Sequence, residues 1–96
     1  MIQRMWSVVA TKEAAKTIAK LPPQIAEKYA LWFAIVSQSG PQGLREYHSF
    51  NDEKLTGKLK HLRSSRLNLQ WRVIYRVEAN VVTVYVERVT LHDYRG

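Results

Sequence analysis

The 96-residue chain contains no cysteine, so neither disulfides nor thiolate metal sites hold its fold together. It has only four glycines, and none of them belongs to a glycine-rich phosphate loop. No apolar run approaches the roughly 18 residues needed to cross a bilayer, so no membrane partner is expected. The N-terminal segment lacks an apolar stretch followed by a small-residue cleavage site, which favours a cytoplasmic location.

Acidic residues are scarce. The chain has 8 Asp and Glu against 15 Lys and Arg, a net charge of +7 and an isoelectric point near 10.0. This imbalance indicates an anionic partner, either nucleic acid, an acidic protein, or both. The remaining composition, 46% hydrophobic and 24% charged, is typical of one globular domain with a small core.

The N-terminal half predicts one strand and two helices. Residues 2–10 alternate loosely, as in a short strand. Thr11 is a candidate N-cap for a helix over 12–20, and Pro22-Pro23 separates it from a second helix that ends near Gln38. We expect these helices to form a hairpin that covers one face of a sheet. The apolar positions that recur at helical spacing in the second helix are Ile25, Tyr29, Trp32, Phe33 and Val36.

The C-terminal half predicts an antiparallel sheet, with strands over 59–66, 70–78 and 81–91. A two-residue turn at Ala79-Asn80 would place Glu78 opposite Val81. Alternation then directs six residues to the core side. The predicted class is α+β, with a short N-terminal strand, a helical hairpin, and a sheet that carries both helices on one face. The six core-facing residues are Val73, Tyr75, Val77, Val82, Val84 and Val86.

That register places His92 beside Leu67, so Arg66, Gln70, His92 and Tyr94 are expected to gather at one end of the sheet. Strict alternation directs His92 to the core side. A bulge near Thr90, or the end of the helix cover, is needed to present its imidazole.

Metal-free RNA cleavage needs a base for the 2′-hydroxyl, cations for the developing charge, and an acid for the leaving oxygen. His92 is the candidate acid, or else a histidine packed on the sheet edge. Arg66 and Arg72 are candidates for phosphate stabilisation, or else surface ion-pair partners. Glu53 is the candidate base. His48 and His61 are weaker candidates.

The remaining cations fit sequence-independent contacts to an RNA backbone. Trp71 and Tyr94 can stack on bases, although a tryptophan that begins a strand is more often core. No pair of histidines has metal-ligand spacing and no Gly-x-Ser-x-Gly elbow is present, so no metal or cofactor is expected. The candidate backbone contacts are Lys54, Lys58, Lys60, Arg63 and Arg76.

The order strand, two helices, basic loop and three strands resembles the RelE/ParE superfamily of bacterial toxin–antitoxin toxins. The resemblance implies a single RelE-like domain over residues 1–96. Its specific part is residues 53–94. The matching segments are Leu55-Thr56-Gly57, Leu62-Arg63-Ser64-Ser65-Arg66-Leu67, Gln70-Trp71-Arg72-Val73-Ile74-Tyr75-Arg76-Val77 and Leu91-His92-Asp93-Tyr94.

The chain looks closest to the RelE and YafQ branch, and this resemblance implies a metal-independent endoribonuclease that cleaves mRNA on the ribosome. By position, His92 matches a catalytic His or Arg, and Arg72 matches a catalytic Arg of some branches. Arg66 and Glu53 each stand where other branches place a catalytic His. Tyr94 matches a late aromatic that packs on the substrate base.

The chain departs from the family pattern at one position, and the family also implies a protein partner. Gln70 replaces an acidic residue of the YafQ pattern. The resemblance also implies a cognate antitoxin, held with the toxin in a hetero-oligomer, whose acidic or helical segment covers the basic surface.

Two alternatives remain at this stage. One is a ParE-like toxin that inhibits DNA gyrase by binding, and the other is a basic RNA-binding module without catalysis. The cation density of residues 58–66 and the His-Asp-Tyr tail favour the nuclease.

Overall fold

The structure, a computed structural model, describes residues 5–91. Within this range five strands form one mixed sheet in the order β1-β5-β4-β3-β2, which confirms the predicted α+β class. None of the helices in residues 5–91 is long and apolar enough to span a membrane. The helices and strands are β1 (Ser7–Ala10), α1 (Lys12–Ile18), α2 (Pro23–Ser39), β2 (Glu53–Lys54), β3 (Arg63–Arg66), β4 (Trp71–Glu78) and β5 (Thr83–Leu91).

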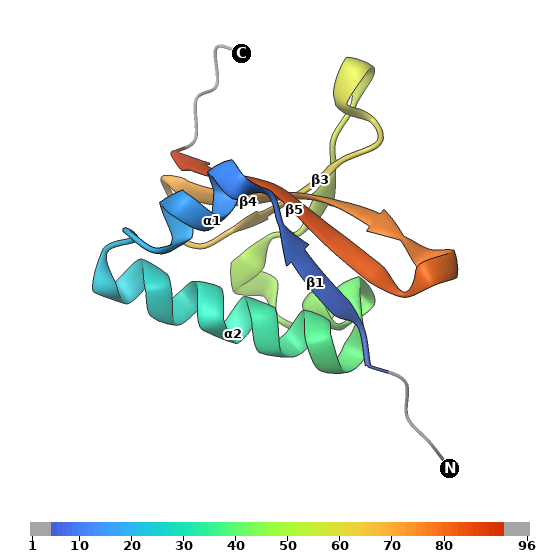
Figure 1. Cartoon of the computed structure of the whole chain (residues 1–96), viewed down its shortest axis with the longest axis horizontal. Coiled ribbons are helices and arrows are strands. Elements are labelled where there is room, and N and C mark those ends of the chain that lie inside the picture. The colour runs from blue at the N-terminus through green and yellow to red at the C-terminus, as the bar shows by residue number, and fades with distance from the viewer. Residues whose placement is uncertain (1–4, 92–96) are drawn as a thin grey trace.

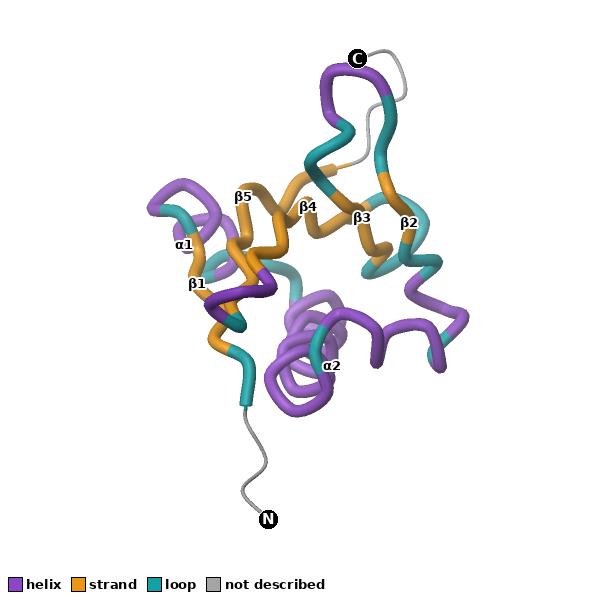
Figure 2. The backbone as a smooth tube through the Cα atoms, turned by 90° about the vertical axis from the view of Figure 1, so that its right-hand side faces the viewer, coloured by secondary structure: helices purple, strands orange, loops and turns teal. Residues whose placement is uncertain are grey.

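Two helices of unequal length pack against the sheet. Figure 1 shows α2 running along the sheet, while Figure 2 shows α1 beside β1 at one end of it. The Thr11 hydroxyl caps α1 by accepting from the Ala14 amide at 3.0 Å, as the sequence predicted. Pro23 begins α2 and Gly40, at a φ of 79°, ends it, because glycine adopts this conformation without steric cost.

The chain between α2 and β3 consists of short 3₁₀ helices, the strand β2 and a projecting loop. Two short 3₁₀ helices, η1 (Pro41–Glu46) and η2 (His48–Phe50), follow α2. Residues 55–62 join β2 to β3 and include a third, η3 (Gly57–Leu59). We call residues 55–62 the β2–β3 loop. It projects away from α2 and from the rest of the domain (Figure 1).

The core lies between α2 and the sheet. Trp32 is fully buried and packs edge-on against Tyr75, with ring centroids 5.4 Å apart. Tyr29 stacks on Trp32 at 5.7 Å. The prediction for α2 holds for Ile25, Tyr29, Trp32 and Val36, but it was wrong for Phe33, which is 43% exposed. Phe33 directly follows Trp32, and a residue one position on points about 100° away around a helix.

The parallel partner of β5 is the N-terminal strand. Ser7 pairs with Thr83 and Ala10 pairs with Val86, so β1 extends the antiparallel sheet with one parallel edge. The same end of the chain is fixed by the Thr11 hydroxyl, which donates to the Glu87 carbonyl at 3.0 Å.

The predicted turn between β4 and β5 was wrong by two residues. Glu78 pairs with Thr83 rather than Val81, and the connection consists of η4 (Ala79–Val81) followed by Val82 in the left-handed region at a φ of 49°. A two-residue type I′ turn would require positive φ at both Ala79 and Asn80. The four-residue turn requires it once. Because a shift of two preserves the faces, the predicted core residues stay on the core side of the sheet, although Val77 is only partly buried and Val82 belongs to the turn.

Replacing Val82 with asparagine should stabilise the protein. A β-branched side chain in the left-handed region is strained, whereas asparagine tolerates it. We expect Val82→Asn to raise the free energy of unfolding by roughly 0.5–1 kcal/mol, measured by urea denaturation. The matched control is Val81→Asn in the same turn, at an exposed position without positive φ. Equal effects of the two variants would contradict the strain at Val82.

Two buried tyrosines should make the fold sensitive to alkali. Burial raises the pKa of Tyr29 from its ordinary value of 10.0 to about 12. Burial, with the nearby Asp52 carboxylate, also raises the pKa of Tyr75. The folded state therefore retains these protons after the unfolded chain has released them. Stability is full below a pH of 10.0 and falls above it.

An absorbance titration of tyrosine ionisation should show Tyr29 and Tyr75 ionising only together with unfolding. In Tyr29→Phe the decrease of stability above a pH of 10.0 should be shallower than in the wild type. An identical pH dependence in both proteins would contradict the assignment of Tyr29.

Candidate functional site

A pocket of about 630 Å³ opens on the face of the sheet opposite α2, which we call the open face. Ser64 of β3, Arg72 and Ile74 of β4, and Thr90 of β5 line it from the sheet. The β2–β3 loop adds apolar walls, including Leu55 and Leu59. We call this cavity pocket A. It combines apolar walls with the cationic side chains of Arg72 and Arg88, and pockets of this kind bind ligands that carry both apolar and polar groups.

The strand register places two candidate arginines and Thr90 in one row. Arg66 pairs with Arg72, and Arg72 pairs with Thr90. Directly opposed residues on neighbouring strands lie on the same side of a sheet, so both guanidinium groups belong to the open face. The sheet therefore places Arg66 and Arg72, the two arginines proposed to stabilise phosphate, on neighbouring strands.

Arg72 is buried at the open face, where it contacts side chains of two neighbouring strands. The residue is 5% exposed, and its Nη1 lies 3.4 Å from Ser64 Oγ and 3.7 Å from Glu53 Oε2. The Glu53 side chain is 50% exposed. A buried guanidinium next to a half-exposed carboxylate provides a fixed positive group and an accessible proton acceptor.

Arg66 lies beside Arg72 on the neighbouring strand. The Nε of Arg66 is buried and has no hydrogen-bond partner within the described range. A buried donor of this kind costs about 1–3 kcal/mol relative to a satisfied one. Binding an oxygen-rich anion at this position would remove that cost.

A β-bulge determines which side chains of β5 reach pocket A. Tyr75 pairs with Val86, while Ile74 pairs with Arg88, so Glu87 is an extra residue in β5. The bulge reverses the alternation that follows it. Arg88 and Thr90 therefore line pocket A, and Val89 faces the core instead.

Sequence reasoning missed Arg88 and Thr90 for this reason. Strict alternation from Val84 and Val86 directs Arg88 inward, and no turn or glycine in 83–91 signals the extra residue. A bulge was anticipated near Thr90, but it lies three residues earlier. His61 was judged a weak candidate, and it lines pocket A as well.

A buried carboxylate anchors the start of β2. Asp52, whose side chain is 3% exposed, accepts from the Ser65 hydroxyl at 2.7 Å and from the Tyr75 hydroxyl. Its second oxygen accepts from Arg63 Nη2 at 2.8 Å and Nε at 3.0 Å. Trp32 Nε1 donates to Ser65 Oγ at 2.9 Å and links the cluster to α2.

The Asp52 cluster, which consists of Asp52 with Arg63, Ser65 and Tyr75, determines the positions of both Glu53 and Arg63. Glu53 is the next residue and lies 3.7 Å from Arg72, so the position of Asp52 determines where the Glu53 carboxylate lies. Arg63, a predicted RNA contact, is bound to Asp52, and its side chain is 28% exposed.

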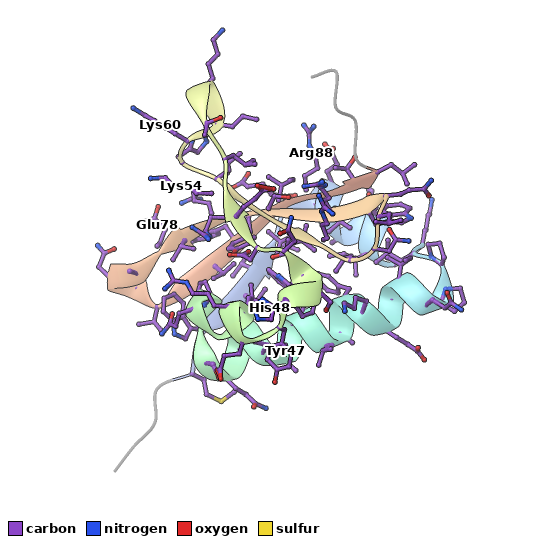
Figure 3. The ribbon with its side chains drawn as sticks, turned by 180° about the vertical axis from the view of Figure 1, so that it is seen from behind. Tyr47, His48, Lys54, Lys60, Glu78 and Arg88 are labelled. Carbon is purple, nitrogen blue, oxygen red and sulfur yellow. The ribbon has the colours of Figure 1, made fainter. Side chains whose placement is uncertain are left out.

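The other predicted RNA contacts are distributed over several environments. Arg76 pairs with Glu78 and with Glu87 at 3.3 Å, and its guanidinium lies 4.3 Å from the Tyr85 ring centroid. Trp71 packs against the core. Lys54 and Lys60 extend from one side of the β2–β3 chain and Arg88 lies on the other (Figure 3). Lys58 is exposed in η3.

Two of the predicted site residues, His92 and Tyr94, lie outside the described residues. The last described residue, Leu91, pairs with Trp71. The predicted pairing of His92 with Leu67 depended on the two-residue turn, which the structure replaces with a longer one. In residues 5–91 no group of three or more His, Asp and Glu side chains is arranged to hold a metal ion.

Removing the charge of Asp52 should destabilise the protein. Asp52→Asn leaves Arg63 without its counterion and presents an amide N–H to a guanidinium, so we expect the free energy of unfolding to fall by about 2 kcal/mol. Urea denaturation measures this decrease. The control is Glu27→Gln on the exposed side of α2, which should remain within about 0.5 kcal/mol of the wild type. A comparable decrease in both variants would contradict the role of the cluster.

The fold is that of known toxins. No protein-family model matches the chain, and no curated protein matches it in sequence. Among solved structures, the archaeal RelE–RelB complex of Pyrococcus horikoshii OT3 contains a chain that superposes with a TM-score of 0.74 at 21% identity, covering 94% of this chain and 98% of that one.

Two bacterial structures agree. YafQ of E. coli BL21(DE3) gives a TM-score of 0.73 at 13% identity, over 91% of this chain and 93% of that one. The YoeB–YefM complex of Staphylococcus aureus gives 0.70 at 18% identity, over 92% and 98%. The chain therefore has the RelE/ParE toxin fold, as the resemblance in sequence implied.

Proposed function

We propose that this chain, which has the fold of RelE/ParE toxins, is the toxin of a type II toxin–antitoxin system and cleaves mRNA on the ribosome. The observation that carries the proposal is the row of Arg66, Arg72 and Thr90 beside pocket A, with Glu53 3.7 Å from Arg72. The net charge of +7 supplies the attraction for RNA.

The proposed reaction is attack of an RNA 2′-hydroxyl on the adjacent phosphate. Glu53 takes the proton of the 2′-hydroxyl, the 2′-oxygen forms a bond to phosphorus, and the bond from phosphorus to the 5′-oxygen breaks. His92 gives a proton to that oxygen. The products are a 2′,3′-cyclic phosphate and a 5′-hydroxyl, and no water is consumed in this step.

The arginines stabilise the phosphorane that forms during attack. Arg72 is fixed by burial, so it does not need to reorganise when charge develops on the phosphate oxygens. Arg66 contributes its buried Nε, which has no acceptor among residues 5–91 and gains one from the bound phosphate. Tyr94 stacks on a base next to the scissile phosphate.

The proposed protein partner is an acidic antitoxin. The RelE–RelB, YoeB–YefM and DinJ–YafQ structures are complexes of a similarly folded chain with its antitoxin. Residues 53–91 of this chain contain eight Lys and Arg against three Glu, so an acidic segment laid over the open face would neutralise the cations that RNA requires.

The nuclease is tested in a cell-free translation reaction by mapping breaks in the mRNA. The wild type should produce ribosome-dependent cuts, and His92→Ala should reduce their rate about 100-fold because the leaving oxygen no longer has its acid. Arg72→Lys should reduce the rate by a similar factor, since lysine lacks the forked pair of donors. Circular dichroism confirms that both variants are folded.

Lys16→Ala on α1 is the control and should cut at the wild-type rate, because it removes one exposed positive charge from a helix that contributes no residue to the lining of pocket A. Intact mRNA together with inhibited DNA supercoiling would contradict the nuclease and support the ParE-like alternative. Intact mRNA with RNA binding would support a module without catalysis.

A further inference from the structure

A second cavity lies on the other side of the β2–β3 chain from pocket A. It has a volume of about 220 Å³ and is lined by Lys54, Lys60, His61, Leu62, Arg63 and Val77. We call it pocket B. His61 and Leu62 line both cavities, so these two residues form the partition between them.

The register of β2 and β3 explains why the two sides differ. Glu53 pairs with Ser64, and Lys54 pairs with Arg63. Successive side chains of a strand point to opposite faces, so the Glu53–Ser64 pair faces Arg72 in pocket A. The Lys54–Arg63 pair faces pocket B. One short ladder therefore carries the site carboxylate on one face and two cations on the other.

Pocket B concentrates positive charge. Among the described residues, its lining contains three cationic side chains and no acidic one. The charge of Arg63 is balanced by the Asp52 carboxylate that it binds, so Lys54 and Lys60 supply the remaining positive charge. Lys54 and Lys60 are exposed and extend to the same side of the chain (Figure 3). Flexible ammonium groups of this kind bind phosphate oxygens without selecting a base.

We propose that pocket B binds a second phosphate of the RNA strand whose scissile phosphate lies in pocket A. The strand passes the partition at His61 and Leu62, with one phosphate on each side. This inference rests on the proposed function, and it adds a substrate requirement. An oligonucleotide must be long enough to reach past the β2–β3 chain before Lys54 and Lys60 contribute to its binding.

The test uses single-stranded DNA, which lacks the 2′-hydroxyl and cannot be cut by the proposed reaction. Binding of a long oligonucleotide of about ten nucleotides is compared with binding of a short one of about four, across a series of salt concentrations. The variant is Lys54→Ala/Lys60→Ala. The matched control is Lys12→Ala/Lys16→Ala, which removes the same charge from α1.

For the long oligonucleotide, we expect the pocket B variant to weaken binding roughly tenfold at low salt. The slope of log K against log salt should become shallower by about 0.7 for each phosphate that the variant no longer binds. The short oligonucleotide should bind the variant and the control equally. If the variant bound both oligonucleotides more weakly by the same factor, the effect would be one of general charge and the proposal would be overturned. Identical binding of the long oligonucleotide to the variant and the control would also overturn it, as would the absence of binding by the wild type.

The cleavage assay separates failure of this inference from failure of the proposed function. If the wild type cuts mRNA on the ribosome but the pocket B variant binds the long oligonucleotide like the control, then pocket B is not a phosphate site and the nuclease stands. If the wild type cuts no mRNA, the proposed function fails irrespective of pocket B.

Discussion

The Asp52 carboxylate, with its side chain 3% exposed, is the interaction on which the site depends. Asp52 accepts hydrogen bonds from β3 and β4 at the point where the chain leaves η2 and enters β2. Through Ser65 and Trp32 the same cluster reaches α2. A carboxylate removed from water in this way is stable only when its donors are all in place. The cluster therefore fixes the loop segment, the sheet and α2 relative to one another, and Glu53 follows directly.

The sheet has two chemically distinct faces because of this arrangement. The face toward α2 is occupied by Trp32, Tyr75 and the valines of β4 and β5, and its polar groups serve the Asp52 cluster. The open face carries Arg66 and Arg72, and α2 packs on the opposite side. Two arginines of this basic chain therefore lie on the face where α2 does not pack, and they support the proposed binding of RNA.

Much of the fold was predictable from the sequence. Thr11, Pro23 and Gly40 mark helix ends through local chemistry, and the alternation of Val73, Tyr75, Val84 and Val86 identifies the core side of two strands. The turn at 79–82 was predicted less well, because Ala79-Asn80 satisfies the pattern of a shorter turn equally well. The longer turn requires Val82 to adopt the left-handed conformation, which β-branched residues rarely adopt.

The site was less predictable than the fold. Arg66 and Arg72 could be brought together by pairing β3 with β4, since short connections favour adjacent antiparallel strands. The Glu87 bulge has no sequence signal, and it alone brings Arg88 to pocket A. The role of Asp52 was not predictable, because its donors Arg63, Ser65 and Tyr75 are distributed over two later strands. Contacts between distant segments leave no periodic trace in a sequence.

The parallel pairing of β1 with β5 has a consequence for synthesis. The contact between Thr11 and Glu87 spans 76 residues, and within residues 5–91 β5 is the one strand that pairs with β1. While a ribosome is still translating the middle of this chain, its first strand has no partner, and closing so long a loop is entropically slow. The nascent polypeptide can therefore complete its sheet only after β5 has emerged from the exit tunnel. Any activity that needs the complete fold begins after that point in synthesis.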